Sequence, residues 1–157
     1  MNTQYQELFA LFREIGAGLE RLTGLATKKL EAVQRDDLET LNEMMNQEQA
    51  ETLVFRGIER KRETLLNALG LSKVPLAALP AACPAEFREE AEQAVQALQD
   101  RYREYRSYAD AARQALEHGL AEIEQVLNDL GGNQPGGPGY QVPETELPTQ
   151  MRTDFRA

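Results

Sequence analysis

The feature that most constrains the fold is a long run of helical periodicity in the second half of the chain. From residue 84 to 130, apolar side chains recur every three or four residues, and no proline follows the first position. This spacing is typical of an α-helix that packs along its whole length on other helices. At 1.5 Å per residue the helix is about 70 Å long. Its apolar positions are Phe87, Ala91, Ala94, Leu98, Tyr102, Tyr105, Ala109, Ala112, Leu116, Leu120, Ile123, Leu127 and Leu130.

Two shorter periodic runs precede it, and the pattern predicts that they form an antiparallel hairpin. The first helix is expected over about 3–34 and the second over about 37–69. Asp36 followed by Glu39 resembles a capping box at the start of the second helix. A connection of two or three residues requires that the two helices lie antiparallel.

Two local features of this hairpin leave alternatives open. Gly16, Gly18 and Gly24 lie inside the first helix, where each weakens the helix locally or allows a neighbouring helix to approach closely. We favour local weakening. The second run is interrupted by the polar sequence NQEQAET at 46–52, which we interpret as a solvated bulge in the helix–helix seam.

The segments on either side of the long run are different in character. Residues 71–83 contain Pro75 and Pro80, which exclude a long helix, and are predicted to form a short helical strap. Residues 131–157 are rich in Gly and Pro and are predicted to be a flexible tail beside a helical domain at 1–130. The predicted fold is all-α: an elongated antiparallel bundle of three long, coiled-coil-like helices (3–34, 37–69 and 84–130), with the strap before the third helix and a C-terminal tail.

The unequal helix lengths predict an uncovered surface. Each of the first two helices is roughly 48 Å long. The third should therefore extend past them from about His118 and leave an apolar stripe without a partner. Three outcomes remain open: docking of an amphipathic helix from another protein, which we favour, pairing with a second copy, or bending at Gly119. The stripe consists of Leu116, Leu120, Ile123, Val126, Leu127 and Leu130.

Composition and charge disfavour several classes of partner. The net charge of −9 disfavours nucleic acid and anionic membrane surfaces, which attract clustered Lys and Arg. No segment reaches the ~18 apolar residues of a membrane span, and the N-terminus lacks the pattern of a signal peptide. With one cysteine in the chain, no internal disulfide can form. We therefore expect a cytoplasmic protein without membrane insertion, either a monomer or a weak homodimer.

The residue pattern does not predict a catalytic site. The chain has one His and one Cys, His118 and Cys83, too few for a zinc site of the usual spacing. Acidic residues are assigned to solvated helix faces and to pairs at helical spacing, as in Glu59, Arg62 and Glu63. No phosphate-binding loop or nucleophile motif occurs. We expect no catalytic residue, no metal and no cofactor.

Four stretches of the sequence together resemble the FlgN family of flagellar export chaperones. They are the turn and second helix RDDLETLNEMMNQEQAE, the loop into the long helix ALPAACPAEFREEAEQ, the end of that helix ALEHGLAEIEQVLNDL, and the tail YQVPETELPTQMRTDFRA. The resemblance spans essentially residues 1–157. It rests on layout and local pattern, because such helices contain no single specific motif.

The resemblance implies a binding protein. Members of the family bind the C-terminal helices of hook-associated proteins at the hook–filament junction, keep them unpolymerised and deliver them to the type III export apparatus. Client contact would fall on the stripe from Leu116 to Leu130. Tyr140 in the tail is expected to contact components of the export gate and ATPase complex. The alternative function is a homodimeric helical adaptor or an anti-sigma-like regulator that pairs through the third helix.

Overall fold

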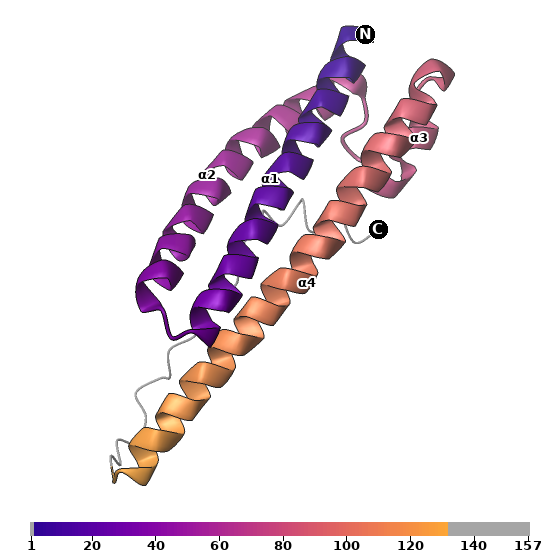
Figure 1. Ribbon diagram of the computed structural model, residues 1–157. Helices are drawn as coiled ribbons and strands as arrows, with labels where there is room; N and C mark the ends of the chain where they lie inside the picture. The colour runs from indigo at the N-terminus through magenta and orange to yellow at the C-terminus, as the bar shows by residue number, and fades with distance from the viewer. Residues whose placement is uncertain (1, 132–157) are drawn as a thin grey trace.

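The computed structural model describes residues 2–131, and within them the chain is all-α with no strand (Figure 1). The helices are α1 (Asn2–Gln34), α2 (Leu38–Leu69), the 3₁₀-helix η1 (Leu76–Ala78), the short α3 (Leu79–Ala82) and α4 (Ala85–Asp129). The three long helices begin and end within one residue of their predicted bounds. The all-α prediction is confirmed. The predicted bundle of three long helices with a short helical strap is not confirmed, because residues 2–131 contain four α-helices.

The long helices are arranged around α1. Figure 1 shows α1 between α2, which runs antiparallel to it, and α4, which runs in the same direction. Both neighbours pack extensively on α1, whereas α2 and α4 hardly contact each other. The sequence of α1 explains this role, because Phe9, Leu11 and Leu25 are buried in addition to a row at three- and four-residue spacing: Tyr5, Leu8, Phe12, Ile15, Leu19, Leu22 and Ala26. Its apolar surface is therefore wide enough for two neighbours.

Two glycines of α1 lie where a neighbouring helix comes close. A Cβ atom added at Gly18 would lie 2.8 Å from the ring of Phe55 in α2, and one added at Gly16 would lie 3.1 Å from Arg101 in α4. Gly24 has no neighbour within 4 Å of an added Cβ. Close approach of a helix, the interpretation that we did not favour, therefore applies at Gly16 and Gly18.

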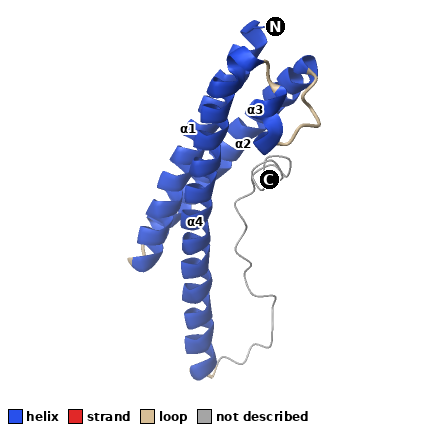
Figure 2. Cartoon of the chain, turned by 90° about the vertical axis from the view of Figure 1, so that its right-hand side faces the viewer, coloured by secondary structure: helices blue, strands red, loops and turns tan. Residues whose placement is uncertain are grey.

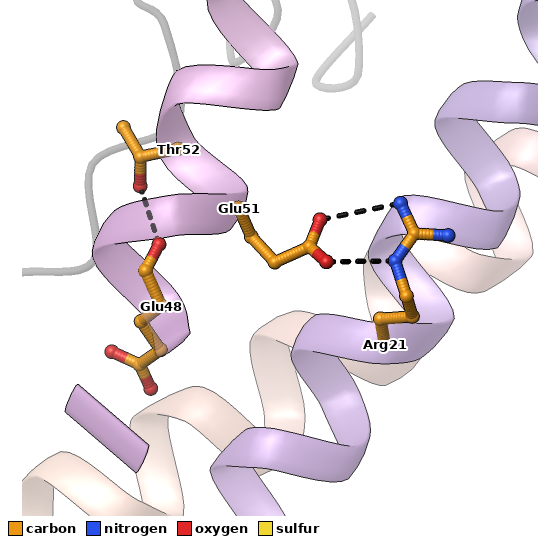
Figure 3. A network of polar contacts seen from close by, with 4 residues as sticks. All are labelled: Arg21, Glu48, Glu51 and Thr52. Carbon is orange, nitrogen blue, oxygen red and sulfur yellow. Dashed lines mark hydrogen bonds and ion pairs between the residues drawn. The ribbon is translucent and has the colours of Figure 1, made fainter. Parts of the chain in front are cut away.

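The polar sequence at 46–52 is part of the interface between α1 and α2, so its interpretation as a solvated bulge was wrong. Figure 3 shows the Arg21 guanidinium donating to both carboxylate oxygens of Glu51, at 2.8 and 3.2 Å. Lys29, which is 8% exposed, lies 3.1 Å from a carboxylate oxygen of Glu48. Cations of α1 thus pair with this segment in place of apolar contacts.

The ion pair between Glu59 and Arg62 also differs from expectation. Its two charged groups lie 2.8 Å apart, as helical spacing suggested, but both residues are only 9% exposed. They belong to the buried side of α2, and the prediction of a solvated face was wrong for them. Each of the two charged groups has its counter-charge beside it, and this is the condition under which charged side chains are tolerated in the interior.

The N-terminus of α2 is capped by Asp37 and not by Asp36. The Asp37 carboxylate accepts hydrogen bonds from the backbone N–H of Thr40 at 3.1 Å and from its hydroxyl at 2.6 Å. These bonds lower the pKa of Asp37 below its ordinary value. Asp36 instead adopts a left-handed conformation with φ of 55°, which aspartate tolerates in tight turns. The helix therefore starts one residue later than the capping-box pattern suggested.

Residues 71–83 close the opposite end of the molecule. Gly70 ends α2 with φ of 72°, and η1 and α3 follow beside the start of α4. Leu76, Leu79 and Cys83 are buried there in the main core. Phe87 at the start of α4 stacks on Tyr5 of α1, with ring centroids 4.9 Å apart. The start of α4 is thereby fixed against the start of α1.

Candidate partner-binding surface

The register between α1 and α4 determines where α4 loses its partner. The ring of Tyr5 stacks on that of Phe87. About four turns further along α4, the Arg101 guanidinium donates to the Gly16 carbonyl at 3.5 Å and to the Glu20 carboxylate at 2.7 Å. With this register, the end of α1 lies beside His118, as the helix lengths predicted. Figures 1 and 2 show α4 continuing well beyond the turn between α1 and α2.

The predicted stripe is divided by this geometry. Leu116 and Leu120 are half-buried beside the hairpin turn. Ile123, Val126, Leu127 and Leu130 are 58, 56, 55 and 78% exposed, and nothing in residues 2–131 covers them. The last buried residue of α4 is Ala112. We call the part of α4 from residue 116 to 129, together with Leu130, the overhang.

The overhang and the hairpin turn together form a groove of about 670 Å³. One wall comes from α4 and the other from the end of α1 and the start of α2. Its apolar lining consists of Ala32, Val33, Leu38, Leu41, Ala115, Leu116, Leu120, Ile123, Val126 and Leu127.

The residues contributed by the hairpin were missing from the predicted site. Leu38 is 75% exposed although it opens the apolar stripe of α2, and Val33 is only half-buried. The sequence contained a signal for them, because both flank the turn that should lie beside the point where α4 becomes uncovered. The candidate surface is therefore a groove with two walls and not the face of a single helix.

Bending at Gly119 does not occur. The helix α4 continues without a break from Ala85 to Asp129, and an added Cβ at Gly119 would have no neighbour within 4 Å. The overhang leads away from the hairpin and does not fold back onto it (Figure 2). Of the three outcomes considered above, bending at Gly119 is therefore excluded.

Of the two reactive side chains that the sequence contains, Cys83 lies apart from this groove and His118 is part of its lining. Burial raises the pKa of the Cys83 thiol, which reduces its thiolate fraction at neutral pH. His118 lies 3.1 Å from the carboxylate of Glu122, one turn along α4. Within residues 2–131 no three His, Cys, Asp or Glu side chains gather as metal ligands would. No helix of that range has the length and hydrophobicity needed for a membrane crossing.

Tyr140, the one predicted contact residue in the tail, lies outside the described residues. The grouping of Leu116, Leu120, Ile123, Val126, Leu127 and Leu130 on one side of α4 is present in the structure.

Searches of curated proteins and of solved structures each found no match. The model of the FlgN protein family matches residues 1–143, a range that includes α1 to α4 and the whole groove. From this match, the chain belongs to the FlgN family of flagellar export chaperones.

Proposed function

We propose that this chain uses the groove at the overhang to bind the C-terminal helices of hook-associated flagellar proteins. The observation that carries the proposal is the row of four exposed apolar side chains, Ile123, Val126, Leu127 and Leu130, in a member of an export-chaperone family. Such a row suits the apolar face of an amphipathic helix, which docks through side chains at positions i, i+3, i+4 and i+7. Covering that face on a client would keep the client from polymerising.

The exposed apolar surface is large enough for this role. Burying one large aliphatic side chain contributes roughly 1.5–3 kcal/mol, so four of them supply a gross gain of about 6–12 kcal/mol. The cost of association and of ordering side chains reduces this figure substantially. Contacts with Leu38, which is 75% exposed on the second wall of the groove, add to the gain.

Delivery to the export apparatus completes the proposed role. The clients would be released at the export gate and ATPase complex, and the segment with Tyr140 is the part of the chain that we assign to contact with them. The support for this part is the family membership alone. It is separable from client binding, because it concerns residues beyond Gly131.

Isothermal titration of the full chain with the isolated C-terminal segments of hook-associated proteins tests client binding. The parent chain should give a 1:1 complex. The double variant Ile123→Asp with Leu127→Asp places two carboxylates on exposed positions, so the fold should survive, and affinity should fall at least 100-fold. The matched control is Leu53→Asp with Val54→Asp, since these α2 residues are 64 and 46% exposed and lie outside the groove. The control should bind as the parent does.

Two results would contradict the proposal. Unchanged affinity of the Ile123→Asp, Leu127→Asp variant would remove the overhang as the binding site. A tight homodimer at low micromolar concentration, observed by sedimentation and lost in the same variant, would favour the homodimeric adaptor instead. In bacteria, secretion of the client should fall with the first double variant and not with the control.

A further inference from the structure

The groove at the overhang is lined by two carboxylates, Asp36 and Glu122, and by no Lys or Arg. Residues 36–43 and 114–131 contain eight of the 26 acidic residues in the chain and none of its 17 Lys and Arg residues. The acidic and basic residues in the rest of the chain nearly balance, so these two segments hold most of the net charge of −9. Arg35 and Arg113 lie directly next to these segments but are not part of the groove lining.

The acidic residues of the overhang border its apolar stripe on both sides. In heptad terms Leu120 and Leu127 occupy position a, and Leu116, Ile123 and Leu130 occupy position d. Glu117 and Glu124 then stand at position e, beside the seam. Glu122 and Asp129, also seven residues apart, border the opposite edge beyond Val126. Charges at the e position select the partner helix in paired helices, because they meet the flanking residues of that partner.

We propose that the partner helix of this groove is basic along its flanks: an amphipathic helix whose apolar stripe is bordered by Lys or Arg. The inference rests on the proposed function and adds the chemistry by which the client helix is selected. Acidic borders attract such a helix and repel one with acidic flanks, which gives specificity and a faster encounter. The hairpin wall acts in the same direction through Asp36, which is exposed and lines the groove.

The same charges argue against the two other occupants. A second copy of the chain docked through this groove would bring two acidic borders together, and like charges at paired flanks are repulsive. Residues 132–157 of the chain contain three acidic residues and two arginines. They therefore offer no net positive charge to the groove. A partner of opposite charge is the occupant that the surface favours.

Two synthetic peptides test the inference on the full chain. Both are 20-residue amphipathic helices with the same leucine stripe, one flanked by Lys and the other by Glu, and binding is followed by fluorescence anisotropy at 50 mM NaCl. The parent chain should bind the Lys-flanked peptide at least tenfold more tightly. That preference should shrink at 500 mM NaCl, because salt screens exposed charges.

Charge-reversal variants locate the effect. Glu117→Lys with Glu124→Lys should reverse the preference, so that the Glu-flanked peptide binds more tightly. The matched control is Glu89→Lys with Glu92→Lys, since both residues are exposed on the packed part of α4. This control changes the net charge equally and should keep the parent's preference. A preference that survives in the first variant would overturn the inference, since it would reflect only the overall charge of the protein.

The remaining outcomes are equally decisive. Equal affinity for the two peptides, or no binding of either, overturns the inference, while the titration with client segments still decides the proposed function on its own. A tight homodimer of the parent chain would assign the groove to a second copy. A tenfold gain in affinity for both peptides in the Met151→Asp, Phe155→Asp variant would assign it to the chain's own C-terminal segment. Either result overturns the choice of a basic partner helix.

Discussion

The two parts of α4 have the same sequence pattern and opposite environments. In the first part, Leu98 and Tyr105 are 3 and 5% exposed against α1, whereas Leu127 and Leu130 in the overhang are 55 and 78% exposed. Both parts repeat apolar residues every three or four positions. The comparison shows that periodicity identifies the face of a helix that will be buried. Whether the chain itself buries that face depends on the length of the neighbouring helices.

The largest difference between the two parts should appear in stability. Leu98→Ala leaves a cavity in the core and should lower the free energy of unfolding by about 2–5 kcal/mol. Leu127→Ala removes a side chain that is already exposed and should change it by no more than about 0.5 kcal/mol. Denaturant unfolding followed by circular dichroism measures both. A comparable loss in Leu127→Ala would mean that the overhang is already covered in the free protein.

The rates of thiol labelling beside the start of α4 and in the overhang should differ by about 100-fold or more. Cys83 is 3% exposed beside the start of α4, and burial raises its pKa, so little reactive thiolate reaches the reagent. A second thiol introduced as Val126→Cys should react with DTNB at the rate of a free cysteine. Denatured protein provides the reference rate for both thiols. If the thiol at 126 were protected in the native chain, the overhang would not be open to solvent.

The smallest effect concerns glycine. Gly119→Ala and Gly24→Ala each replace a helical glycine with no neighbour within 4 Å of the new Cβ, and each should favour the helix locally by about 1 kcal/mol. Gly24 lies in α1, which unfolds with the core, so its replacement should raise the global free energy of unfolding. Gly119→Ala should instead slow hydrogen exchange of the overhang amides about fivefold and leave the denaturation midpoint unchanged. A shift of the midpoint in Gly119→Ala would show that the overhang unfolds together with the core.

Much of this architecture could be predicted because it depends on local pattern and on length. The helix bounds follow from periodicity and breakers, and the overhang follows from the longer run at 84–130. The pairing of Arg21 with Glu51 and of Lys29 with Glu48 could not be predicted, because it depends on the register between two helices. For the same reason, the polar segment at 46–52 was misassigned.

Of the two walls of the groove, only the one formed by α4 was predicted from the sequence. The α4 wall of the groove was contained in one periodic stripe, but Val33, Leu38 and Leu41 belong to stripes that seemed to be used within the hairpin. Periodicity does not reveal that the last turn of one helix and the first turn of the next leave part of their apolar surface open. The family resemblance assigned the client surface to α4 and gave no indication of the second wall.

The central position of α1 also sets an order of assembly during synthesis. Its polar contacts with α2 join residues 19 to 30 positions apart, whereas its contacts with α4 join residues more than 80 apart. Shorter loops close at a lower entropic cost and earlier, so the hairpin can form while α4 is still being translated. Until Phe87 leaves the ribosome, Tyr5 and Phe9 of α1 lack the ring that packs on both of them. A protein of a chaperone family thus passes through a nascent stage in which its own apolar surface needs protection.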